Sequence, residues 1–285
     1  MLASRVLMVR PTRFGFNPET AGTNAFQSDD PSNEALAEFD HLAMALSDAG
    51  IEPIIFDQAP DCPSPDAIFP NNWVSFHEEG AVLYPMLSPL RRTERRMDIL
   101  EALGKEIICD FSHFEQDARF LEGTGSMVLD RKEKFCFVCV SDRSDRMLAF
   151  QWCQRMDFRL IDFDTLGPGG VPVYHTNVVG SIGEGLAVVC SEVIVEKTVL
   201  NLFTSLDEYE AISITMDQMQ NFCGNILQLN GSKGKVIAMS ECARSHFRPD
   251  QLRSLEGHGA IVASPIPSIE RIGGGPVRCM LAEVF

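Results

Sequence analysis

The chain has 285 residues, of which 45% are hydrophobic and 22% are charged, and its 24 basic and 40 acidic residues give a formal net charge of −16. These are the proportions of an ordinary globular protein, so they exclude a disordered or collagen-like chain. The excess of negative charge argues against binding to nucleic acid or to an anionic membrane surface, because both need a basic footprint.

Strand-like and helix-like patterns alternate along the chain. In chain order the predicted elements are a strand at 5–9, a helix at 34–48, a strand at 54–56, a helix at 91–103, strands at 107–109 and 135–140, a helix at 142–156, strands at 159–163 and 186–190, a helix within 216–227, a strand at 236–239, a helix at 249–255, and strands at 261–263 and 279–284. No linker rich in proline or serine interrupts this alternation. We therefore expect one α/β domain over residues 1–285, built from repeated strand–helix units.

The apolar segments favour a protein of the cytoplasm. No run of about 18 apolar residues occurs, so we expect no segment that spans a membrane. The apolar N-terminal stretch is interrupted by Arg5 and Arg10, which favours a buried strand over an export signal. The nine cysteines are scattered, and several lie in apolar runs such as CFVCV (136–140), as is typical of reduced, buried thiols.

Four clusters place polar residues between apolar strands and turns rich in glycine or proline. They are PDAIFPNNW (65–73), RFLEGTGS (119–126), VYHTNVV (173–179) and RIGGGPVRCML (271–281). Each is compatible with an ordinary turn when taken alone. The CFVC segment (136–139) has the spacing of a redox motif, but residues three apart on a strand face opposite sides, which predicts core positions. No cluster has the spacing of metal ligands or of a phosphate loop, so we expect no cofactor.

Cys279 is the strongest candidate for a nucleophile. It follows three glycines and a proline, and such a turn lets the backbone approach a ligand closely and leaves N–H groups exposed. The neighbouring Arg278 favours ionisation of the thiol. The other eight cysteines are interpreted as buried strand residues.

His175 and Asn177 form a second candidate group. We expect them at the end of a strand, where residues two apart point to the same side, so that one site could use both. A cysteine and a histidine from distant segments are typical of a thiol enzyme, although a lone histidine is more often a satisfied core or surface group. The RRTERR segment (91–96) is interpreted as a helix face, with one arginine turned toward a substrate anion.

Together and in this order, the four clusters resemble the guanidino-group-modifying superfamily of the pentein fold. Its members include arginine deiminases, dimethylarginine dimethylaminohydrolases and amidinotransferases. The resemblance covers most of the chain and implies a five-bladed α/β propeller of repeated ββαβ units with a central polar funnel. It implies that Cys279 is the nucleophile, that His175 is the general acid and base, and that Glu122 binds the terminal nitrogens of the substrate.

The resemblance also implies a set of substrate-binding residues. Asp66 and Phe69, in an Asp-x-x-Phe segment, correspond to substrate-contacting positions. Arg91 and Arg143 resemble arginines that hold the α-carboxylate of the substrate.

Three positions that carry carboxylates in arginine deiminases do not carry them here. They are occupied by Asn72, Gly125 and Asn177. A guanidinium cation in a pocket must be paired with negative charge, whereas an asparagine amide can face a neutral urea group with both a donor and an acceptor. The HTN and GGGPVRCMLAE segments also resemble the citrulline-hydrolysing branch of the superfamily. We therefore expect a thiol hydrolase that converts citrulline to ornithine, ammonia and CO2 through a covalent intermediate on Cys279.

Other activities stay open from the sequence. The same residues fit an arginine deiminase or a dimethylarginine dimethylaminohydrolase, and less well an amidinotransferase. Outside the enzymes, a non-catalytic pentein that binds a macromolecule is the alternative. The expected partner is a small ureido or guanidino amino acid, and the sequence is compatible with a homo-oligomer.

Overall fold

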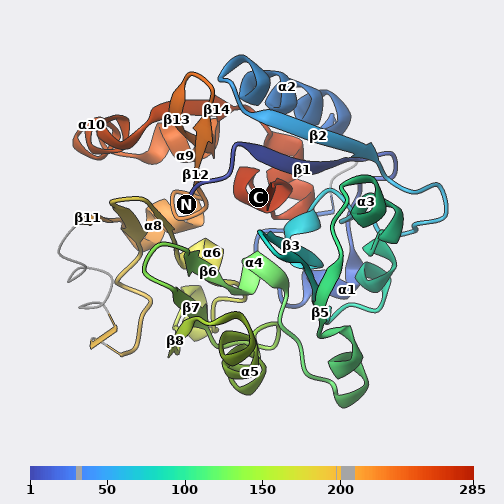
Figure 1. Cartoon of the computed structure of the whole chain (residues 1–285). Helices are drawn as coiled ribbons and strands as arrows, with labels where there is room; N and C mark the ends of the chain where they lie inside the picture. The colour runs from blue at the N-terminus through green and yellow to red at the C-terminus, as the bar shows by residue number, and fades with distance from the viewer. Residues whose placement is uncertain (30–33, 197, 200–208) are drawn as a thin grey trace.

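The computed structural model describes residues 1–29, 34–196, 198–199 and 209–285. Its strands form five three-stranded sheets arranged in a ring (Figure 1). In sheet order the strands are β15 (Ala282–Val284), β1 (Arg5–Arg10) and β2 (Glu52–Asp57); β3 (Val74–His77), β4 (Gly80–Leu83) and β5 (Ile107–Asp110); β6 (Val128–Asp130), β7 (Phe135–Cys139) and β8 (Arg159–Phe163); β9 (Gly180–Gly183), β10 (Leu186–Val189) and β11 (Glu210–Ser213); and β12 (Leu227–Gly231), β13 (Gly234–Ser240) and β14 (Ala260–Ser264).

All five sheets have the same topology. The first strand pairs antiparallel with the second, and the second pairs parallel with the third. A parallel pair needs a crossover connection, which is usually helical. The crossover helices are α2 (Ala35–Asp48), α3 (Met97–Ala102), α5 (Arg146–Met156), and α9 (Glu241–His246) followed by α10 (Pro249–His258). The expected five-bladed ββαβ architecture is therefore confirmed.

The sheet of β15, β1 and β2 joins the first and last strands of the chain. Strand β15 pairs antiparallel with β1, in a register that sets Arg5 against Val284 and Leu7 against Ala282. Both chain ends accordingly lie near the middle of the view in Figure 1. The single domain over 1–285 stays a prediction, and this ring closure supports it.

The helices form where apolar spacing and end signals agree. Helix α2 buries Phe39, Leu42 and Leu46 against the sheets, and Gly50, at φ +88°, takes the left-handed conformation that ends the segment. Among the described residues, no helix combines the length and apolar character that crossing a membrane requires.

Several predicted elements differ from the structure. The helix predicted at 91–103 is a 3₁₀ turn, Leu90–Glu94, followed by the shorter α3. The helix predicted at 142–156 begins only at Arg146, because the side chain of Asp145 caps it by accepting from the N–H of Leu148. Strands β3, β4, β6, β9, β11 and β12 were not predicted. They are only three to five residues long, which is too short for periodicity to reveal them.

The four polar clusters form short helical turns near the centre of the ring. These turns are η1 (Pro70–Asn72), α4 (Gly123–Ser126), α6 (Thr176–Val179) and η6 (Val277–Met280). Turn α4 contacts both η1 and α6, and η1 contacts η6. His175 is thus the residue before a helical turn and not the end of a strand, and Cys279 lies in a 3₁₀ turn before the last strand rather than within it.

Candidate active site

The central turns surround one pocket with about 280 Å³ of empty volume. It is lined by residues of all the clusters except that of Glu122, and by the N-terminal segment: Thr20, Asn24, Asp66, Phe69, Asn72, Arg91, Arg143, Tyr174, His175, Gly273, Gly274, Gly275 and Cys279. The structure therefore brings seven of the nine predicted site residues to one cavity. The other two, Glu122 and Asn177, lie directly behind it and bond to His175 and Cys279.

The Cys279 thiol lies between two asparagine amides. Its Sγ accepts from Nδ2 of Asn177 and from Nδ2 of Asn225, each at 3.4 Å. Burial raises the pKa of the thiol, against the effects of these two donors and of Arg278. The resting group is therefore the thiol, and both amides are placed to stabilise the thiolate when it forms.

His175 and Glu122 form a buried pair. Nε2 of His175 lies 2.9 Å from Oε2 of Glu122. Burial disfavours ionisation of Glu122, but Arg143, His175 and Arg91 outweigh it and hold the pKa of this carboxylate at about 2. Burial lowers the pKa of His175, against the attraction of Glu122. The histidine is thus neutral at rest, with its proton on Nε2 because a carboxylate can only accept, and Nδ1 is free to take a proton.

Arg91 is held in place by a network of its own. Its Nε and Nη2 donate to the two carboxylate oxygens of Glu94 at 2.9 and 3.0 Å, and its Nη1 donates to Oδ1 of Asn72 at 2.8 Å. The amide oxygen of Asn72 is therefore already bonded inside the protein. A fixed arginine with two bonds to one carboxylate keeps a defined orientation toward the pocket.

Asp66 and Arg143 anchor the N-terminal segment that covers the pocket. Asp66 accepts from Nδ2 of Asn17 at 2.8 Å and from Oγ1 of Thr20 at 3.2 Å, and burial raises its pKa. Arg143 donates to the backbone oxygen of Thr20 and to Oγ1 of Thr23, both at 3.1 Å. Its guanidinium also lies 3.6 Å from Glu122. These contacts hold the N-terminal segment against the pocket that Cys279 lines.

The glycine turn before Cys279 gives space to an aromatic ring. A Cβ at Gly273 or at Gly275 would lie 2.9 or 2.6 Å from the ring of Phe69. The close approach that the sequence predicted for a ligand is thus made by Phe69. Gly125 has a comparable role, since its position faces Asn72 and the ring of His175 without room for a side chain.

Asn225 is the site residue that the sequence did not reveal. It stands alone before β12, outside the four clusters, so only the fold places it beside the sulfur. Its Oδ1 accepts from the N–H of Arg278 at 3.1 Å, while Nδ2 donates to the backbone oxygen of Asn177 at 3.0 Å. One side chain therefore links the two segments that hold Cys279.

An Asn225→Asp variant tests this position. The aspartate keeps the acceptor for the Arg278 N–H but replaces the donor to Sγ by a negative oxygen, which disfavours the thiolate and raises the pKa of Cys279 further. The thiolate fraction grows as pH rises through the thiol pKa, so we expect the alkylation curve of Cys279 to move to higher pH and its rate at pH 8 to fall by about tenfold or more. Iodoacetamide labelling followed by mass spectrometry measures it. The exposed Asn230→Asp is the control, and an unchanged curve for Asn225→Asp would contradict the assignment.

Metal ligation has no matching site among the described residues, because no group of three or more His, Cys, Asp or Glu side chains there is placed to hold an ion. The chemistry that the pocket itself offers is a thiol beside two amide donors, a neutral histidine paired with an anionic glutamate, and two fixed arginines. This combination suits covalent attack on an electrophilic carbon of a ligand that carries an anionic group.

Solved structures share the fold along the whole chain. One is the N-terminal domain of ArgZ bound to substrate, an arginine dihydrolase from the ornithine-ammonia cycle in Cyanobacteria, with a TM-score of 0.76, 16% identity and 98% of each chain covered. AgrE with L-arginine has a TM-score of 0.75 at 17% identity, and 99% of the present chain covers 40% of it. DDAH from Pseudomonas aeruginosa complexed with citrulline has a TM-score of 0.65 at 12% identity, with 99% of each chain covered.

Comparisons at the level of sequence give a family but no individual relative. No curated protein matches the chain. The family model for N,N dimethylarginine dimethylhydrolase, eukaryotic, matches residues 10–285, which include all four clusters. The chain therefore belongs to this dimethylarginine dimethylhydrolase family, within the pentein superfamily of guanidino-group-modifying proteins.

Proposed function

We propose that the protein is a cysteine hydrolase that cleaves a carbon–nitrogen bond in the guanidino group of a free amino acid of the arginine type. The observation that carries the proposal is the convergence of Cys279, the His175–Glu122 pair and two buried arginines at one pocket. Family membership supports it, and so do the relatives of the same fold that are described with arginine or citrulline bound.

The charge around the pocket suits a cationic group. Three buried carboxylates, of Asp66, Glu94 and Glu122, face two buried guanidinium groups, of Arg91 and Arg143. Asp66 lines the cavity, and its raised pKa reflects burial that Arg91 does not fully offset. A bound guanidinium supplies the missing positive charge, and it also favours the thiolate of Cys279 by its own charge.

The reaction follows from the two protonation states. Nδ1 of His175 takes the proton of the Cys279 thiol as the thiolate attacks the guanidino carbon. The imidazolium then gives that proton to the departing nitrogen, which leaves as ammonia or an amine, and an S-linked intermediate remains. A water molecule, deprotonated by His175, attacks the same carbon, and the thiolate leaves as the carbon–sulfur bond breaks. Glu122 keeps the imidazole oriented and stabilises its cationic form.

Citrulline is the second candidate substrate, and a separate observation favours it. The two side chains that bond Sγ of Cys279 are neutral amides, and no described carboxylate bonds to that sulfur. The neutral ureido group needs no negative partner, whereas its oxygen can accept from an amide donor. On this substrate the leaving group is ornithine, and the carbamoyl group on sulfur is hydrolysed to CO2 and ammonia.

A substrate panel with an Asn177→Asp variant tests both candidates. Arginine, an Nω-methylated arginine and citrulline are each assayed for release of ammonia or amine, citrulline and ornithine. We expect wild-type turnover of a guanidino substrate. We expect Asn177→Asp to raise the kcat/KM ratio of arginine to citrulline by about tenfold, because a negative charge beside Sγ of Cys279 favours a cationic over a neutral group at that sulfur. The new carboxylate also disfavours the thiolate, but this effect is shared by both substrates and cancels in the ratio. Asn72 is a less informative position, since its oxygen already bonds Arg91.

The results of the substrate panel distinguish the two candidate substrates and test the proposed function itself. Release from citrulline alone would replace the first candidate by the second. No release from any guanidino or ureido amino acid, with the fold intact, would contradict the proposed function. An unchanged substrate ratio in Asn177→Asp would contradict the electrostatic argument about the amides.

A further inference from the structure

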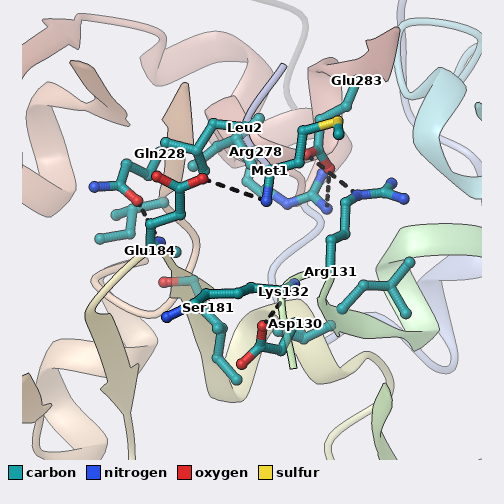
Figure 2. A pocket seen from close by; sticks show the side chains of 16 residues that line it. Met1, Leu2, Asp130, Arg131, Lys132, Ser181, Glu184, Gln228, Arg278 and Glu283 are labelled. Carbon is teal, nitrogen blue, oxygen red and sulfur yellow. Dashed lines mark hydrogen bonds and ion pairs between the residues drawn. The ribbon is translucent and has the colours of Figure 1, made fainter. Parts of the chain in front are cut away.

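A second pocket is lined by Arg278, the residue before Cys279, and is shown from close by in Figure 2. It has about 540 Å³ of empty volume. It is lined by the first strands of several blades, namely β6, β9, β12 and β15, and by residues outside these strands, which include Met1, Arg131 and Arg278. Cys279 lines the catalytic pocket, whereas its neighbour Arg278 lines this one. None of the predicted site residues lines it, so the proposed hydrolase activity leaves this pocket without a role.

Two arginines in this pocket share a single carboxylate. Nε of Arg131 lies 3.8 Å from Oε1 of Glu283, and Nη2 of Arg278 lies 3.7 Å from Oε2. Figure 2 shows both guanidinium groups beside Glu283. These distances are longer than hydrogen bonds, so the carboxylate attracts the two groups without binding either of them closely.

The other acids of the pocket have closer partners. Asp130 accepts from the hydroxyl of Tyr209 at 2.8 Å and from two backbone N–H groups. Glu184 pairs with Nζ of Lys235 at 2.8 Å. Among the described acids of this pocket, only Glu283 therefore pairs with the two arginines, so two positive charges face one negative charge. Arg278 also donates from Nη1 to the backbone oxygen of Leu281 at 3.2 Å, and Nη1 of Arg131 lies 3.4 Å from Nδ1 of His77, but neither of these partners adds a negative charge.

Burial makes the excess positive charge costly. The side chain of Arg278 is 7% exposed and that of Arg131 is 12% exposed. Burial lowers the pKa of Arg278, and the attraction of Glu283 does not offset it. The contrast is Arg91, whose surrounding carboxylates outweigh burial and raise its pKa. A buried guanidinium that lacks a full partner gains free energy when an anion is added.

We propose that this second pocket binds a small oxyanion, a phosphate or carboxylate group, between Arg131 and Arg278, and that its occupancy lowers the reactivity of Cys279. The planar guanidinium matches the oxygens of such anions, and each can donate two parallel hydrogen bonds. The site is separate from the arginines that face the catalytic pocket.

Arg278 connects the second pocket directly to the thiol of Cys279. Arg278 precedes Cys279 in the chain, and its positive charge favours the thiolate. Its backbone N–H bonds Oδ1 of Asn225, whose amide in turn donates to Sγ. An anion on the Arg278 guanidinium offsets that charge, so the thiolate becomes harder to form.

The test titrates inorganic phosphate, and separately acetate, into the protein by calorimetry, with chloride holding the ionic strength constant. We expect Arg131→Gln to weaken the binding by about tenfold or more, because it removes one of two charged donors. Glu283→Gln is expected to tighten it by about threefold or more, because the competing carboxylate is gone. The exposed Arg253→Gln is the matched control and is expected to bind as the wild type does.

The two variants are expected to change the affinity for the anion in opposite directions, which makes the proposal testable. Binding that neither Arg131→Gln nor Glu283→Gln alters would put the anion elsewhere, the catalytic arginines included, and would overturn the site. Labelling of Cys279 by iodoacetamide tests the coupling without any substrate, so it stands apart from the proposed function. Saturating phosphate is expected to slow labelling in the wild type but not in Arg131→Gln, and equal rates with and without phosphate would overturn the coupling.

Discussion

Replacing Cys279 by serine is expected to reduce turnover by about 10⁴-fold or more while leaving the fold intact. The hydroxyl fits the same space and can still accept from Asn177 and Asn225, so the hydrogen bonds of the site persist. The loss is chemical, because a serine hydroxyl has a much higher pKa than a thiol and the neutral His175 is too weak a base to ionise it. Initial rates of product release and thermal unfolding of the variant measure the two effects.

A second cysteine gives the matched comparison. Cys62 is buried like Cys279, and its sulfur lies 3.5 Å from the hydroxyl of Thr93, so a serine there also finds a polar partner. Cys62→Ser is expected to keep wild-type turnover. Activity retained by Cys279→Ser, or lost equally in both variants, would remove Cys279 from the reaction.

Gly125→Ala is expected to lower kcat/KM by about 10²-fold or more. A Cβ at this position would lie 2.5 Å from Nδ2 of Asn72 and 2.8 Å from the ring of His175. Both neighbours are buried and hydrogen-bonded, so one methyl group must displace the general base or the amide beside it. Stability falls by only about 1–3 kcal/mol, as is usual for an overpacked site. Steady-state kinetics together with thermal unfolding separate the two effects.

Gly257 supplies the control for that substitution. It lies in helix α10, and no atom lies within 4 Å of the Cβ that an alanine would add. Gly257→Ala is expected to leave kcat/KM unchanged and to stabilise the helix slightly, since alanine is the better helix former. Wild-type kinetics for Gly125→Ala would show that His175 has room to move and is not fixed by this contact.

The residues proposed to be catalytic could be singled out from the sequence because each lies in a short segment with a strong local signal. Cys279 follows three glycines, and Glu122 stands beside a glycine turn, and such turns are visible in the sequence without knowledge of the fold. The resemblance then predicted that the segments share one pocket, and the structure places seven of the nine predicted residues around one cavity, while their roles stay a prediction. Asn225 had no such signal. It is an isolated asparagine before a strand, and only the fold shows that it lies beside Cys279.

The fold was less predictable at its centre than at its outside. The crossover helix α2 can be predicted from the spacing of its apolar residues, because one of its faces packs on the sheets and the other is exposed to water. The strand β4 is buried at every position and is only four residues long, so it carries no alternation. The conformation of His175 is similarly set by packing of its turn against α4 and not by its own neighbours in sequence.

The pairing of β1 with β15 has a consequence for how the protein reaches its working state. Arg5 and Val284 are among the most distant residues in the chain, and a contact across so long a loop is entropically costly and forms slowly. The nucleophile stands three residues before that last strand. The position of Cys279 therefore depends on the pairing of β1 with β15, the longest-range strand pair among the described residues. Local separation of these two strands would displace Cys279, and activity would be lost before the five sheets unfold.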